Sequence, residues 1–165
     1  EIRGRKYKLP YEEWIADEYI KATPGDVQDY EYIRQDINDI IKDYDLQSIA
    51  FDRWNSSQLI IQLSQQDGIP MSQFGQGYRS MSAPSKELEK LVLKKEINHL
   101  NNPVLRWQCE NIQLQTDPAG NIKINKQKSS EKVDGMVALV MAIGEMMTDE
   151  APGDSIYNER GILSF

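Results

Sequence analysis

Two side chains that often bind metals are almost absent from this chain: it has one cysteine, Cys109, and one histidine, His99. A single cysteine excludes a disulfide within the chain, and one cysteine with one histidine is too few for a structural zinc site. Any metal held here must therefore be bound by carboxylates, whose oxygens suit Mg²⁺ and Mn²⁺.

The chain also lacks long apolar runs and a phosphate-binding loop. No stretch approaches the length of a membrane span, and residues 1–4 show no apolar segment of a signal peptide. Gly75 and Gly77 lack a third glycine, and no GxxxxGKS or GxxxxGKT motif occurs. We therefore expect a soluble protein without membrane contact, retained in the compartment of its synthesis, and without an ATPase site in this chain.

The length and the charge distribution favour one domain with a basic surface. At 165 residues the chain is about one domain, which we place at 1–148, followed by an acidic tail of low order at 149–165. The net charge is −7, yet the segment from Lys86 to Lys132 contains nine basic residues and only six acidic ones. Local potential, rather than the total charge, steers a polyanion. A nucleic-acid partner is therefore compatible with the acidic composition.

Hydrophobic periodicity predicts alternating helices and strands, and hence an α/β fold. Asp29 is suited to cap a helix with apolar residues at three- and four-residue steps, and Pro84 to the first turn of another. Turn residues separate two alternating segments, which predicts a β-hairpin with one wet face. The expected helices are 11–16, 30–43, 56–66, a segment from 84 onwards, 104–109 and 134–147; the expected strands are 19–23, 46–51, 70–74, 112–116 and 122–124.

Asp52 directly follows one of these strands. In open α/β sheets, ligands bind at the carboxyl ends of the strands, so this acid lies where chemistry is expected. The alternative is that Asp52 helps to start the helix that follows it. The local sequence favours neither interpretation over the other.

Asp134 opens the apolar run 136–147, which predicts a helix buried over much of its circumference. Its carboxylate could complement the helix dipole, or it could serve a metal site that handles phosphates. Paired carboxylates on different elements are used in phosphodiester hydrolysis by two metal ions, about 3.5–4 Å apart. Lys126, Lys128 and Lys132 precede the helix and would contact the flanking phosphates.

Four blocks of the sequence, at 50–55 (AFDRWN), 76–82 (QGYRSMS), 99–107 (HLNNPVLRW) and 128–135 (KSSEKVDG), resemble the nuclease domain of tailed-phage terminase large subunits. They occur in the order and spacing of that family, within a resemblance that runs from about Trp14 to Gly144. The resemblance implies a ribonuclease H-like fold, a mixed sheet flanked by helices. It also implies a metal-dependent endonuclease that cuts concatemeric double-stranded viral DNA during genome packaging.

Carried over by position, the resemblance makes Asp52 and Asp134 catalytic residues and ligands of two Mg²⁺ or Mn²⁺ ions. The candidate DNA-binding residues are Arg79, Lys126, Lys128 and Lys132, and His99 is a further site candidate. The family further implies the terminase small subunit and the portal as partners, in the cytoplasm of a bacterial host cell. A prophage gene is also compatible with the resemblance.

Two parts of the family pattern have no counterpart in this chain: the acid on the first strand of the sheet and the N-terminal ATPase motor. We therefore expect a sheet that is incomplete at its N-terminal strands, a metal position lacking one principal ligand, and self-association through an exposed sheet edge. Three functions remain open. They are an active endonuclease domain, a catalytically incomplete fragment that binds DNA or the packaging machine, and a general α/β domain for a small ligand.

Overall fold

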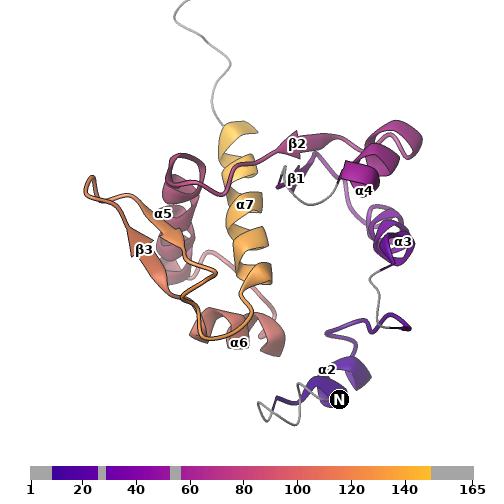
Figure 1. Ribbon diagram of the computed structural model, residues 1–165, viewed down its shortest axis with the longest axis horizontal. Helices are drawn as coiled ribbons and strands as arrows, with labels where there is room; N and C mark the ends of the chain where they lie inside the picture. Colours follow the sequence, from indigo (N-terminus) through magenta and orange to yellow (C-terminus); the bar gives the residue numbers. More distant parts are fainter. Residues whose placement is uncertain (1–8, 26–28, 53–56, 150–165) are drawn as a thin grey trace, which may run out of the picture.

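The computed structural model describes residues 9–25, 29–52 and 57–149 (Figure 1). The predicted tail therefore lies almost entirely outside the described residues. The elements follow one another as α2 (Tyr11–Ala16), α3 (Tyr30–Ile40), β1 (Ile49–Phe51), α4 (Ser57–Ile61), the π-helical turn η1 (Gln62–Gln66), β2 (Met71–Gln73), α5 (Tyr78–Lys94), α6 (Pro103–Glu110), β3 (Leu114–Thr116), β4 (Ile122–Ile124) and α7 (Asp134–Asp149).

The predicted buried helix is confirmed as α7, which forms the centre of the main core. It contacts α5, α6 and β1. Apolar side chains occur on nearly every side of this helix, so they find partners on several neighbouring elements at once. The buried residues of this first cluster are Met81, Ile124, Val133, Met136, Val137, Val140 and Met141.

The predicted β-hairpin is also confirmed. β3 and β4 pair antiparallel, with Leu114 opposite Ile124 and Thr116 opposite Ile122. Ile124 is buried in the first cluster, whereas all three residues of β3 are exposed. Alternating side chains thus turn one face of β4 towards α5 and α7.

A second, smaller core holds the first half of the chain. Its buried residues are Leu59, Leu63 and Ile69, and one face of α3 packs against them. β1 and β2 pair in parallel beside this core, with Ile49 opposite Met71. Ile49 packs against the second cluster and Ala50 against the first, because successive residues of a strand point to opposite faces. β1 therefore lies between the two cores.

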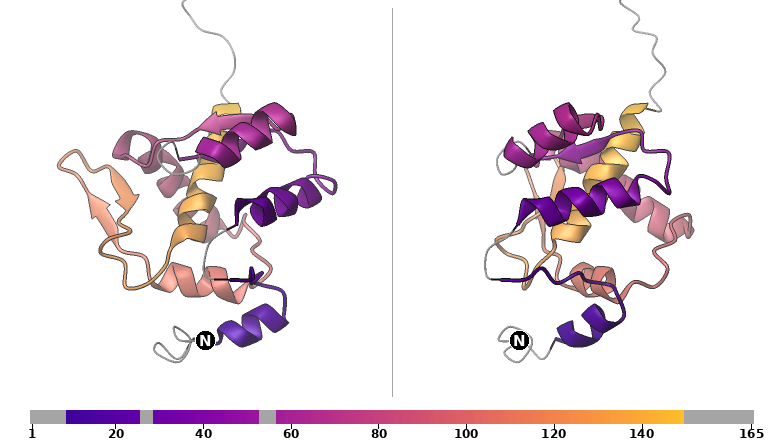
Figure 2. Two further views of the ribbon diagram at one scale, coloured as in Figure 1. Left: turned by 45° about the vertical axis from the view of Figure 1, so that its right-hand side comes forward. Right: turned by 90° about the vertical axis from the view of Figure 1, so that its right-hand side faces the viewer.

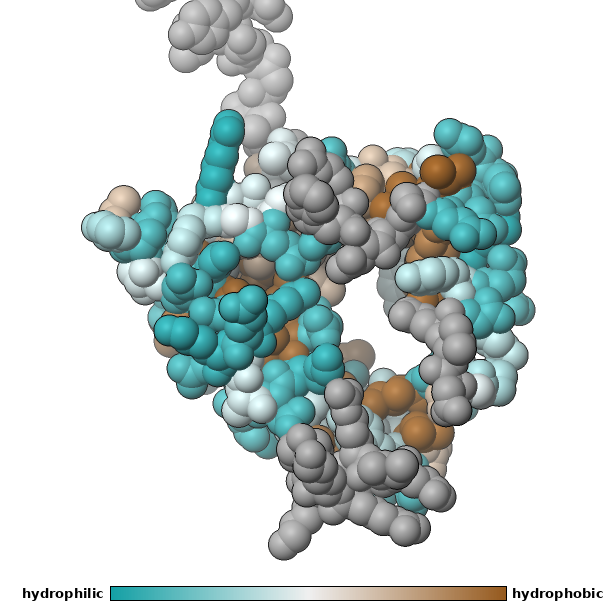
Figure 3. Space-filling model, viewed as in Figure 1, coloured by the Kyte–Doolittle hydropathy of each residue, from teal (hydrophilic) through white to brown (hydrophobic). Residues whose placement is uncertain are grey.

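The second core lies on one side of α7, and the other elements of the first core, α5 and the hairpin, lie on the opposite side. In Figure 1 the hairpin and α5 occupy one side and α3 with α4 the other, and the left view of Figure 2 shows the same division. The space-filling view shows an opening between α7 and the α3 side, with hydrophobic residues around it (Figure 3). Aromatic contacts of Trp107 with Tyr11 and Trp14, at ring centroid distances of 6.4 and 5.6 Å, connect α2 to α6.

Three predictions about the fold require correction. Residues 19–23 form no strand, because the amides of Tyr19 and Ile20 bond back to the carbonyl of Trp14 and turn the chain. Pro84 lies inside α5, which already begins at Tyr78, and not in a first helical turn as predicted. The mixed α/β class is confirmed, but within the described ranges the strands form two separate pairs and no larger mixed sheet. No helix in the described part is long and apolar enough to cross a membrane.

Candidate metal and nucleic-acid site

Asp134 is the first residue of α7, and its side chain is 65% exposed. The nearest cation is Lys126, whose Nζ lies 3.3 Å from Oδ1 of Asp134 and whose side chain is 42% exposed. An exposed ion pair of this kind is weak, so the lysine is easily displaced. The carboxylate is thus accessible from solvent and lies at the positive end of the helix dipole.

The start of α7 is held in place by Gln108 of α6. Its Oε1 accepts hydrogen bonds from the amides of Gly135, at 2.6 Å, and Met136, at 3.2 Å. These amides belong to the first turn of the helix, where the backbone offers no acceptor. A Cβ at residue 135 would lie 2.9 Å from the same Oε1, so a side chain there would require the Gln108 cap to shift. Gln108 therefore fixes the backbone on which Asp134 is mounted.

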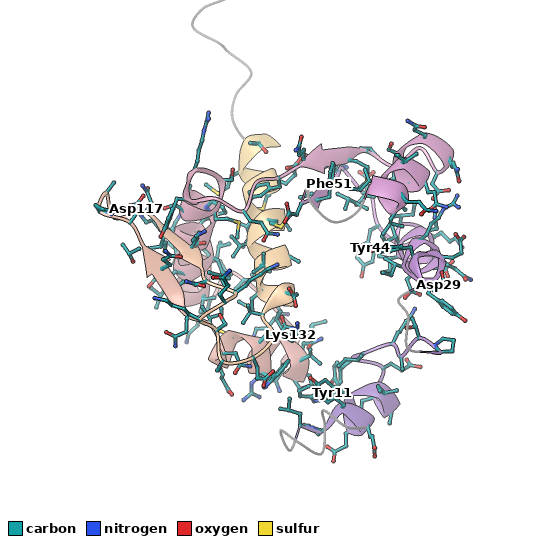
Figure 4. All side chains as sticks on the ribbon, viewed as in Figure 1. Tyr11, Asp29, Tyr44, Phe51, Asp117 and Lys132 are labelled. Carbon is teal, nitrogen blue, oxygen red and sulfur yellow. The ribbon has the colours of Figure 1, made fainter. Side chains whose placement is uncertain are left out.

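The lysine-containing loop before α7 is ordered by short polar contacts. The side-chain oxygen of Asn125 accepts from the amides of Gln127, at 3.0 Å, and Lys128, at 3.1 Å. Ser130 Oγ donates to Asn111 Oδ1 at 2.7 Å, which ties the loop to the end of α6. Lys128 and Lys132 remain exposed, and Figure 4 shows Lys132 close to the start of α7.

Asp52 follows β1 and is half-buried. Residues 48, 50 and 52 share one face of an extended chain. Ser48 on that face hydrogen-bonds Glu145 of α7 at 3.0 Å, and Ala50 packs against the first core. Residues 53–56 lie outside the described part of the chain.

The two predicted acids are therefore carried by elements that contact each other. The contact is at the other end of the helix, however: Ser48, just before β1, meets Glu145, which lies about 16 Å along the axis of α7 from Asp134. Figure 4 likewise shows Phe51 beside the later half of α7 and Lys132 at its beginning. Binding of one metal by both Asp52 and Asp134 stays a prediction.

The other two site candidates, Arg79 and His99, lie outside the loop that leads into α7. Arg79 is exposed in the first turn of α5. His99 is exposed in the loop between α5 and α6, where its backbone carbonyl accepts from the amide of Asn102 at 3.0 Å. It also lines an apolar cavity that α5, α6, the hairpin and α7 enclose.

The described residues form no metal site by themselves. In the ranges 9–25, 29–52 and 57–149, no group of three or more His, Cys, Asp or Glu side chains could hold a metal ion. Asp52 and Asp134 offer the carboxylate oxygens that Mg²⁺ and Mn²⁺ prefer, but two ions need more ligands than these. The described donor set is thus incomplete for a two-metal site.

These observations define a class: a mixed α/β chain that carries carboxylates and exposed lysines near the start of a buried helix. Comparison with known families narrows the class. The family described as "Terminase large subunit, endonuclease domain" matches residues 2–150. The chain belongs to this family, as the resemblance in its sequence predicted.

Individual relatives agree with the family. The chain is 38% identical over 149 residues to the terminase large subunit of Enterobacteria phage HK97, covering 87% of this chain and 29% of that protein. It is 30% identical over 142 residues to Protein YmfN of Escherichia coli (strain K12), covering 85% of this chain and 31% of the relative. The chain therefore spans about 30% of the length of these relatives.

The fold has a counterpart among solved structures. The crystal structure of the HK97 bacteriophage large terminase superposes with a TM-score of 0.79 at 36% sequence identity. The match covers 87% of this chain and 30% of that protein. The small sheets and helices described above are therefore arranged as in the matching part of that terminase.

Proposed function

We propose that this chain acts as the endonuclease part of a DNA-packaging terminase and cuts concatemeric double-stranded DNA with the help of divalent metal ions. The observation that carries the proposal is Asp134, exposed at the start of the buried helix α7 in a chain whose residues 2–150 match an endonuclease domain. The core around α7 and the Gln108 cap hold the backbone that carries this carboxylate, which supports its use as a metal ligand. The ribonuclease H-like arrangement of the sheet belongs to the same proposal.

In this proposal, Asp134 and Asp52 each contribute carboxylate oxygens to a set of ligands for Mg²⁺ or Mn²⁺. Bound divalent ions would activate water and stabilise the leaving oxygen of a phosphodiester. Gln108 holds the helix start that carries Asp134. Lys126 neutralises that carboxylate when no other cation is present.

Exposed cations beside Asp134 supply the contacts to DNA. Lys128 and Lys132 belong to the ordered loop that leads into α7, and both extend into solvent. Such contacts to phosphates add affinity and orientation without reading the base sequence. Membership of the family implies DNA as a partner. Further proposed partners are the small subunit, the portal and a second copy paired at the edge of β1 that has no neighbouring strand among the described residues.

Incubation of supercoiled plasmid with the protein and Mn²⁺ tests the proposal. We expect conversion to the nicked form, loss of nicking in Asp134→Asn, and slower nicking in Lys132→Ala, which loses a phosphate contact. Lys21→Ala is a matched control, because Lys21 pairs with Asp36 on the α3 side of the chain. Absence of nicking by a folded protein that binds Mn²⁺ would contradict catalysis by this chain.

A second function is favoured by the incomplete donor set and by the ion pair between Lys126 and Asp134. A fragment that binds DNA or the packaging machine without cutting needs cations but no complete metal site. Gel-shift titrations separate the two functions. Binding that weakens steeply with salt, without nicking in Mn²⁺, supports the binding fragment, whereas nicking excludes it.

A further inference from the structure

The hairpin of β3 and β4 carries little negative charge on a chain that is acidic overall. It packs beside α5 (Figure 1), and Figure 4 shows Asp117 at its tip. Residues 111–130, which contain the hairpin and the loop after it, include three lysines and a single acid, Asp117. The chain has 26 acids in 165 residues, so about three are expected in a segment of this length. The hairpin is therefore a basic region of an acidic protein.

The one acid of this segment is occupied within the turn. The carboxylate of Asp117 accepts hydrogen bonds from the amide of Ala119, at 2.9 Å, and from the amide and side chain of Asn121, both at 2.8 Å. Lys86 Nζ donates to the carbonyl of Gly120 at 3.2 Å, which ties the tip to α5. Asp117 thus shapes the tip of the hairpin and forms no ion pair with a lysine of the described ranges.

Lys123 is held in position without an acid beside it. It lies in the middle of β4, on the face opposite the buried Ile124. Its Nζ lies 5.1 Å from the centroid of the Tyr78 ring, and it forms no ion pair within the described part of the chain. A cation–π contact restrains the ammonium group but does not neutralise it. This positive charge is therefore available to an outside anion.

The residue opposite Lys123 is also suited to a phosphate. Gln115 of β3 faces Lys123 across the ladder and is exposed. Its Oε1 accepts from Asn125 Nδ2 at 3.1 Å, which leaves its Nε2 to donate outwards. Amide and lysine side chains are typical contacts of phosphate and sugar oxygens in DNA complexes.

This pair lies close to the candidate site at the start of α7. Lys126 follows Lys123 by three residues, so their α-carbons are at most about 11 Å apart. Lys126 Nζ lies 3.3 Å from the carboxylate of Asp134. A duplex that reaches Asp134 would therefore also meet the outer face of the hairpin.

We propose that the outer face of the β3–β4 hairpin binds the backbone of duplex DNA, with Lys123 on a phosphate and the amide of Gln115 beside it. This assignment rests on the proposed function in taking DNA as the partner, and it adds a second contact surface to the loop that leads into α7. The contact positions the duplex and reads no base sequence.

Fluorescence anisotropy with two labelled duplexes of unrelated sequence, in EDTA, tests the contact of Lys123. Lys123→Gln should weaken binding about 3- to 10-fold for both duplexes and reduce the slope of log affinity against log salt by about 0.9, as for one lost phosphate contact. Lys123→Arg keeps the charge and the ring contact and should bind like the parent protein. Lys94→Gln, the same loss of charge about 24 Å along α5 from Tyr78, should also bind like the parent.

Gln115→Glu separates DNA binding from hairpin stability. The new acid lies opposite Lys123, where a cross-strand ion pair is favourable, so the urea midpoint should stay the same or rise. DNA binding should nevertheless fall at least as much as in Lys123→Gln. Gln65→Glu makes the same change in charge at an exposed position of η1, beside the second core, and should leave DNA binding unchanged.

Three results would overturn the DNA contact of the hairpin. If Lys132→Ala weakens DNA binding while Lys123→Gln and Gln115→Glu bind like the parent protein, the hairpin contact fails and the proposed function stands. Equal weakening by Lys94→Gln and Lys123→Gln would reduce the effect to net charge. If the parent protein binds neither duplex, the hairpin contact and the DNA binding of the proposed function fail together.

Discussion

The two cores of this molecule differ in size and in what holds them together. The first contains seven buried apolar residues around α7, and the second contains three beside α3. Asp134 is mounted on the first, whereas the strand that leads to Asp52 lies between the two. The two candidate carboxylates therefore depend on packing in different regions, and a change in one region need not disturb the other.

The smaller core is supplemented by a polar contact. Arg34 donates two hydrogen bonds to Asp67, at 2.7 and 2.6 Å, and Asn38 donates a third at 3.0 Å. The side chains of Arg34 and Asp67 are 20% and 13% exposed, so solvent screens this pair less than a fully exposed one. In the first core, by contrast, apolar side chains supply most of the contacts to the middle of α7.

The largest loss of stability should follow from a substitution that creates a cavity in the smaller core. Leu63 is 2% exposed, and Leu63→Ala should lower the free energy of unfolding by about 2–5 kcal/mol. If the two cores open separately, hydrogen exchange will accelerate in α3, α4 and β1 while α7 keeps its protection. Ile61→Ala, at a half-exposed position of α4, is the control with a small expected effect. Equal loss of protection in α7 would show that the cores act as one unit.

Gly144 tests the tightness of the larger core. A Cβ there would clash with the ring of Phe74 and lie 3.3 Å from Pro84. Overpacking costs about 1–3 kcal/mol, which exceeds the gain of up to about 1 kcal/mol from replacing a helical glycine by alanine. Gly144→Ala should thus lower stability in urea titrations. Gly77→Ala, where a Cβ meets open space, should change it little; a stabilised Gly144→Ala variant would contradict the tight packing.

Substitutions at Gln108 test whether its cap on α7 positions Asp134. Gln108→Leu removes the acceptor for two amides and should cost about 0.5–2 kcal/mol, the range measured for lost helix caps. It should also weaken Mn²⁺ binding without changing the charge. Gln108→Glu retains an acceptor at the same place and should recover most of the stability. Normal Mn²⁺ affinity in Gln108→Leu would mean that the cap does not position Asp134.

The smallest expected change is in how the stability of the protein depends on acid pH, through Asp67 in the smaller core. Hydrogen bonds from Arg34 and Asn38 lower the pKa of Asp67 from 3.8 to about 2. Because the pKa is lower in the folded state, the pair stabilises the fold fully above about pH 4, and this contribution disappears as the pH falls towards 2. Thermal unfolding midpoints at pH 5 and pH 2.5 should therefore differ less in Asp67→Asn than in the parent protein. An unchanged difference would assign the acid sensitivity to other carboxylates.

Local patterns in the sequence predicted much of the fold. The apolar run after Asp134 predicted α7, and the three- and four-residue spacing after Asp29 predicted α3. The alternation around residues 114 and 124 predicted the hairpin of β3 and β4. Residues 19–23 misled the prediction because the amides of Tyr19 and Ile20 bond back to Trp14, a local turn that the composition of the segment does not reveal. Pro84 misled it because the proline packs close to α7 from within α5, which is a tertiary effect. The contacts between Arg34 and Asp67, 33 residues apart, are equally invisible to local periodicity.

The candidate site was predictable only in part. Asp52 and Asp134 were found from their places at a strand end and a helix start, and the structure retains both places. Gln108 was missed, because a helix capped by a side chain from another helix leaves no signal within its own first turn. The relation between the two acids depends on how β1 crosses α7, which neither residue's neighbours in sequence determine.

Paramagnetic line broadening by Mn²⁺ is the most direct test that Asp52 and Asp134 serve one metal site. With a small fraction of one Mn²⁺ per chain, the amide signals of residues 50–52 and of residues 134–136 should both broaden. Asp134→Asn should abolish the broadening in both segments. Persistence of the broadening at residues 50–52 in that variant, or broadening confined to one segment in the parent protein, would contradict a shared site.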